Sequence, residues 1–188
     1  MPLVSILLGT SNIRANAVAG IVTVDGNTVS QVFMNEISVQ GMPEGAEAEI
    51  QQFIKDGELR NKKLQQQVET LGSQKPLTPK NTATIAYDEE VLGKTESAKE
   101  TKASGPLPHV PLIALSEGAS DSLDDQIWHA SIKQFSKQVP CGIFKVVPNT
   151  SHYIQIDQPQ YVIAAVQTVL QAAKKGKNLC GVEIRWPN

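Results

Sequence analysis

In the last eighty positions, apolar residues occur in two kinds of pattern that follow each other along the chain: continuous short runs and helical spacing. Two short aliphatic runs, Val110–Leu115 and Gly142–Val147, have the length and composition of buried strands. Each run precedes a stretch with apolar residues at three- and four-residue steps, which predicts a helix. The two helical stripes are Leu123, Ile127, Trp128, Ile132 and Phe135, then Tyr161, Val162, Ala165, Val166, Val169 and Leu170. Strand, helix, strand and helix in this order predict parallel strands joined by helical crossovers.

The first forty residues hold two more runs of the same kind. Leu3–Leu8 and Val18–Val24 are short, aliphatic and bounded by Gly or Asp, as buried strands are. The second run ends at Asp25-Gly26-Asn27, which is a turn signal. The chain is therefore expected to be an α/β protein with about four parallel strands in a three-layer arrangement.

Residues 42–104 differ from the segments on either side. Apolar residues at helical spacing predict a helix over 44–71, with Gly57 interrupting it and Gly72 ending it. Residues 72–104 are mostly polar, so we expect a polar linker with a short surface helix at 96–100. The predicted organisation is a core made of 1–41 and 105–188, with 42–104 as a helical, cap-like insertion.

Composition and charge exclude several classes of protein. The chain has 188 residues, a formal net charge of -2 and 40% hydrophobic residues, enough for one core. Nucleic-acid binding needs a concentrated basic face, which this balanced charge does not predict. The lysines of 174–177 are explained by their place at a helix C-terminus, where positive charge is favourable. No apolar run approaches the ~18 residues of a membrane span. The two cysteines lack metal-type spacing and are expected to be reduced thiols in a cytoplasmic protein.

Side chains able to do acid–base chemistry follow the predicted strands. In a parallel sheet, catalytic groups collect just beyond the carboxyl ends of the strands. Asp25, Asp121 and His152 each follow a predicted strand, and Ser11 follows the run Leu3–Leu8. An acid, a histidine and a serine at one edge are the components of a Ser-His-Asp relay.

Three segments resemble the C-terminal half of an α/β-hydrolase. Asn149–Pro159 is similar to the family's G-H-x-I-x-x-x-x-P stretch, in which the histidine is the catalytic base. Pro108–Leu115 with Gly118-x-x-Asp121 resembles the strand and G-x-x-D turn that lead to the catalytic acid. Val18–Asp25 is similar to the strand after the nucleophile helix, commonly V-x-G-L-V-L-V-D.

The resemblance implies a hydrolase of esters or related acyl bonds, acting on a small-molecule acyl substrate without metal or cofactor. His152 would be the base, Asp121 the acid and Ser11 the nucleophile, with Asp25 as the alternative acid because relatives sometimes place it one strand earlier. The family's G-x-S-x-G nucleophile motif is missing, and the nearest string, Gly9–Ile13, has Ile in place of the last Gly. The alternative reading is therefore a shortened, catalytically inactive hydrolase that acts as a binding protein.

The family's sheet also implies that the four predicted strands are neighbours in chain order, with Leu3–Leu8 at an edge. That run has no charged residue to protect it against pairing with another chain. We expect segment 44–71 to cover this edge, the edge to fray, or the chain to self-associate through it.

Overall fold

The core is a parallel sheet of three strands in chain order. The computed structural model describes residues 18–25, 38–103, 106–118 and 121–187. Strands β1 (Ile21–Val24), β2 (Leu112–Ser116) and β3 (Ile143–Val146) pair in the order β1-β2-β3, all parallel. Three predicted strands, their parallel direction and their order in the sheet are thus confirmed. The fourth predicted strand, Leu3–Leu8, lies outside the described residues.

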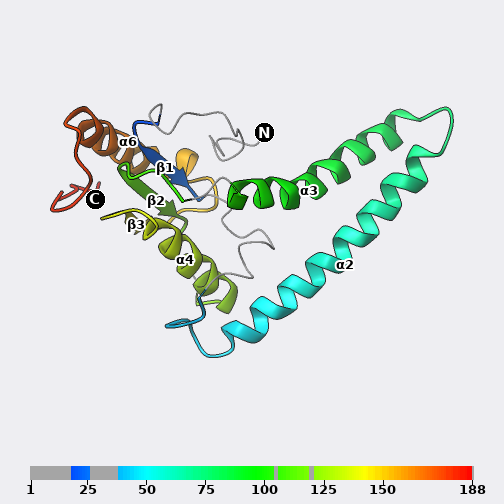
Figure 1. The fold of residues 1–188 in the computed structure, drawn as a ribbon, viewed down its shortest axis with the longest axis horizontal. Helices are drawn as coiled ribbons and strands as arrows, with labels where there is room; N and C mark the ends of the chain where they lie inside the picture. Colours follow the sequence, from blue (N-terminus) through cyan, green and yellow to red (C-terminus); the bar gives the residue numbers. More distant parts are fainter. Residues whose placement is uncertain (1–17, 26–37, 104–105, 119–120, 188) are drawn as a thin grey trace.

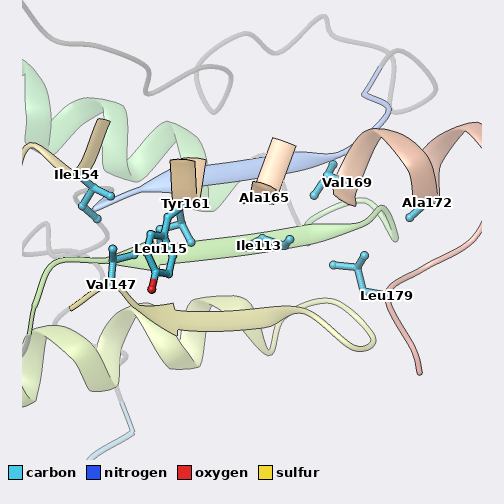
Figure 2. Packing of buried hydrophobic residues seen from close by; sticks show 9 residues of the cluster. All are labelled: Ile113, Leu115, Val147, Ile154, Tyr161, Ala165, Val169, Ala172 and Leu179. Atoms are coloured by element: carbon cyan, nitrogen blue, oxygen red, sulfur yellow. The ribbon is translucent and has the colours of Figure 1, made fainter. Parts of the chain in front are cut away.

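Helices cover both faces of this sheet (Figure 1). Helix α4 (Leu123–Ser136) contacts β2 and β3, and α6 (Pro159–Lys174) contacts β1 and β2. Alternate residues of β2 enter different clusters, because successive side chains of a strand point to opposite faces. Ile113 and Leu115 pack with α6, as Figure 2 shows, and Leu112 and Ala114 pack with α4. The predicted mixed α/β class is confirmed.

Two long helices extend away from the sheet (Figure 1). Helix α2 (Ala46–Gly72) and helix α3 (Pro79–Ala103) contact each other and meet at a turn far from the core. The near end of α2 rests on α4 through one apolar cluster, called here the α2 base cluster. It consists of Ala46, Ile50, Ile54 and Ile127, with Met42, Leu123 and Trp128 packed against it.

Two sequence-based expectations for this region are wrong. Gly57 does not interrupt α2, because it is buried and the helix continues through it. The segment expected to be a polar linker forms α3 over most of its length, Pro79–Ala103. The expectation rested on polarity, but Ala, Glu and Lys favour a helix although few of them are apolar, and α3 is rich in them. Contact with α2 adds to this preference.

The expectation of two reduced thiols is also wrong. Cys141 and Cys180 form a disulfide, with a Cα–Cα distance of 5.1 Å. The bond joins the turn before β3 to the segment after α6, which no spacing along the chain could indicate. Further along that segment, Trp186 stacks on Tyr161 of α6 with ring centroids 5.8 Å apart. Among the described helices, none combines the length and apolarity needed to cross a membrane.

Gly142, at the turn into β3, should not tolerate a side chain. A Cβ at this position would lie 1.9 Å from the Ser136 carbonyl oxygen, so the backbone would have to move. We expect Gly142→Ala to lower the free energy of unfolding by about 2–3 kcal/mol. The control is Gly93→Ala in α3, where a Cβ meets nothing within 4 Å. Urea denaturation of both variants should show loss for the first and a gain of about 0.5–1 kcal/mol for the second.

The disulfide should add measurably to stability. It closes a loop with a sequence separation of 39, for which the loss of unfolded-chain entropy is worth about 3–4 kcal/mol. We expect Cys180→Ser to lower the free energy of unfolding by about that amount. Thiol alkylation of the denatured wild-type protein should label no cysteine before reduction and two after it. Labelling of both before reduction would contradict the bond.

Candidate functional site

The candidate site lies where the three strands end. Asp25 directly follows β1, and its backbone N–H donates to the Leu115 carbonyl at 2.9 Å. The N–H of Val147, just after β3, donates to the Ser116 carbonyl at the same distance. These bonds extend the ladders of the sheet by one step, so the side chains after all three strands meet at one edge. This is the edge at which ligands bind in open parallel sheets.

Asp25 and His152 form the centre of the site. The Asp25 backbone has a φ of 43°, in the left-handed region that Asp tolerates better than most residues. Its side chain is fully buried, and its Oδ2 lies 2.5 Å from Nδ1 of His152. The expectation that His152 lies in a loop past a strand end, beside Asp121 or Asp25, is confirmed for Asp25.

The second carboxylate oxygen of Asp25 accepts three further hydrogen bonds. The donors to Oδ1 are the Trp128 indole Nε1–H at 3.0 Å, the Ser116 hydroxyl at 3.2 Å and the Glu117 backbone N–H at 3.3 Å. A buried carboxylate needs such partners, because removing it from water without them is costly. Both oxygens therefore have fixed roles, one bound to the protein core and the other to the histidine.

The loop that carries His152 is anchored through the two residues that precede the histidine. Before it, the Thr150 hydroxyl donates to the Val147 carbonyl at 2.9 Å and accepts from Gly118 N–H at 3.1 Å. Closer to the histidine, the Ser151 N–H and hydroxyl both donate to Asp157 Oδ2, at 2.8 and 2.7 Å. These two bonds lower the pKa of the Asp157 carboxyl, because they stabilise its charged form.

The chemistry open to His152 follows from its bond to Asp25. A carboxylate only accepts hydrogen bonds, so Nδ1 of the neutral imidazole carries the proton and Nε2 keeps its lone pair. The side chain is 60% exposed, so molecules from solvent can reach the ring. A histidine oriented by a buried acid in this way can act as a general base.

Glu117 adds a negative charge beside this pair. Partial burial raises the pKa of its carboxyl, and repulsion from the Asp25 and Asp125 carboxylates raises it further. The His152 and His129 side chains oppose that rise. Glu117 therefore holds its proton to a higher pH in the folded protein than in the unfolded chain.

Of the site residues predicted from the sequence, the structure brings only some together. The carboxylate on His152 is Asp25, the alternative acid. Asp121 lies in the exposed turn before α4, where its carbonyl oxygen accepts from the Gln126 side chain at 3.2 Å. Ser11 lies outside the described residues. Among the described residues, no group of three or more His, Cys, Asp and Glu side chains could hold a metal ion.

The roles of Ser116 and Trp128 could not be inferred from the sequence. Trp128 belongs to the apolar stripe of a predicted helix, and no motif contains Ser116. The available signal was the indole N–H, which needs a partner when a tryptophan is buried. No family model, curated protein or solved structure matched this chain when it was compared with them.

The raised pKa of Glu117 predicts a pH-dependent effect on stability. A carboxyl with a raised pKa in the folded state destabilises the fold as pH rises through and above its ordinary value of 4.5. We therefore expect Glu117→Gln to raise the melting temperature at pH 7 by about 1–2 °C and to leave it unchanged near pH 4. The control is Glu89→Gln, the same change of charge at an exposed position on α3. Thermal melts at both pH values test this expectation, and an equal gain in melting temperature at pH 4 would contradict it.

Proposed function

We propose that this chain is an acyl-bond hydrolase of the α/β-hydrolase type, with His152 as general base and Asp25 as the acid that orients it. The observation that supports this most strongly is the 2.5 Å contact between a fully buried carboxylate and Nδ1 of an accessible histidine. The pair also stands at the carboxyl edge of a parallel sheet, the position that such chemistry requires.

The sequence resemblance supports the same assignment, through the motifs that contain these two residues. The motif Asn149–Pro159 contains the histidine in the family's position, and Val18–Asp25 ends in the carboxylate that contacts it. Ser11 is the proposed nucleophile, and its role rests on the sequence alone. The proposed substrate is a small ester, whose carbonyl the serine attacks while Nε2 of His152 takes the hydroxyl proton.

A set of variants tests the proposal and the choice of acid. Turnover of short-chain nitrophenyl esters and labelling by a fluorophosphonate probe should both be lost in His152→Ala and Ser11→Ala. Asp25→Asn should reduce turnover by a factor on the order of 10³–10⁴, because the amide no longer holds the imidazole in the required tautomer. Asp121→Asn is the matched control, and it should retain activity near that of the wild type.

Two outcomes would overturn parts of the proposal. Loss of turnover in Asp121→Asn together with retention in Asp25→Asn would reverse the assignment of the acid. Absence of both probe labelling and ester turnover in the folded wild-type protein would reject the enzyme and favour the inactive binding protein.

A further inference from the structure

Trp128 occupies a position that neither the resemblance nor the proposed chemistry assigns. Its indole Nε1–H donates to Asp25 Oδ1 at 3.0 Å, the shortest of the three bonds to that oxygen. The other two donors come from β2 and its end: Ser116 is the last residue of this strand, and Glu117 follows it. Trp128 instead belongs to α4, in the helical layer that covers the sheet. Trp128 is therefore the one of these three donors that reaches the carboxylate from a helix and not from the sheet.

The same side chain contacts two apolar clusters. Its ring packs against the cluster between α4 and the sheet, which includes Leu112, Ala114 and Ile132. It also packs against the α2 base cluster, through which α2 rests on α4. A displacement of α2 that changed this packing would move the indole, and the indole N–H would move relative to Asp25.

We propose that Trp128 is a positioning residue that holds the Asp25 carboxylate toward His152 and makes its orientation depend on the packing of α2 on α4. The proposal rests on the proposed function, in which the orientation of Asp25 decides whether His152 can act as a base. The indole N–H holds Oδ1, so Oδ2 remains directed at Nδ1 of His152. Without that donor, only the two longer bonds from Ser116 and Glu117 hold Oδ1, so the carboxylate is less firmly oriented toward the imidazole.

The tautomer of His152 reports on its hydrogen bond with Asp25, and it can be measured in a protein that has no enzymatic activity. Asp25 selects the Nδ1–H form, because the bond made by one ring nitrogen decides which nitrogen carries the proton. The ¹⁵N shifts of both ring nitrogens, measured at a pH where the ring is neutral, give the fraction of that form. Asp25→Ala provides the reference in which this hydrogen bond is absent.

Two changes at position 128 remove the donor. Trp128→Phe is the simple variant, and replacement of Trp128 by 3-benzothienylalanine keeps the shape of the indole while exchanging N–H for sulfur. We expect both proteins to show a loss of the Nδ1–H form of His152 that is partial compared with Asp25→Ala. Ester turnover should fall about tenfold in kcat with KM unchanged, since the group acts through another residue.

A pair of substitutions in α2 tests the second half of the proposal. Ile54→Ala opens the α2 base cluster, whereas Leu64→Ala alters α2 outside that cluster. We expect the first to lower the Nδ1–H fraction of His152 and the second to leave it unchanged. Equal effects, or none, would overturn the dependence on α2.

The outcomes separate this inference from the proposed function. An unchanged tautomer in the 3-benzothienylalanine protein, with its melting temperature retained, would overturn the positioning role even if Trp128→Phe fails to fold. A wild-type protein without turnover would reject the hydrolase proposal, and the tautomer measurement would still support or overturn the role of Trp128.

Discussion

The buried carboxylate of Asp25 is the interaction on which the arrangement of the site depends. A charge removed from water needs compensating donors, and here they come from β2, α4 and the loop after β3. Meeting that need brings three separate parts of the chain to one point. The left-handed turn at Asp25 ends β1 there, and the sheet register sets the heights of Ser116 and of the loop that carries His152. The arrangement of the site residues thus follows from the hydrogen bonds that the buried Asp25 carboxylate needs.

The rest of the fold supports that point from two sides. On one face, α6 packs on β2, with Ile113 and Leu115 fully buried (Figure 2). On the other face, α4 carries the indole of Trp128 and also receives the near end of α2. The long α2–α3 pair (Figure 1) is therefore attached to the core through the same layer that supplies a donor to Asp25. Ordinary side-chain packing thus connects the projecting helix α2 to Trp128, the residue of α4 that donates to Asp25.

The sequence was sufficient for features that depend on local pattern. Aliphatic runs predicted the three strands, and the rule for parallel sheets placed Asp25 and His152 at the same edge. The sequence favoured Asp121 as the acid and kept Asp25 as the alternative, because both follow a predicted strand and only the side-chain positions separate them. Helix α3 was missed because few large apolar residues mark its contact with α2. The pairing of Cys141 with Cys180 depends on how the last segment returns to β3.

The positions of the two tryptophans have a practical consequence. The chain contains only Trp128 and Trp186, and they lie against opposite faces of the sheet. The first contacts a carboxylate, and the second stacks on Tyr161 with the Lys145 ammonium 5.8 Å from its ring. Their fluorescence should differ in intensity and wavelength, because a charged or polar neighbour changes the emission of an indole. The protein thus contains two intrinsic optical probes, one at the sheet edge that carries Asp25 and His152 and one in the C-terminal segment, and no attached dye is needed.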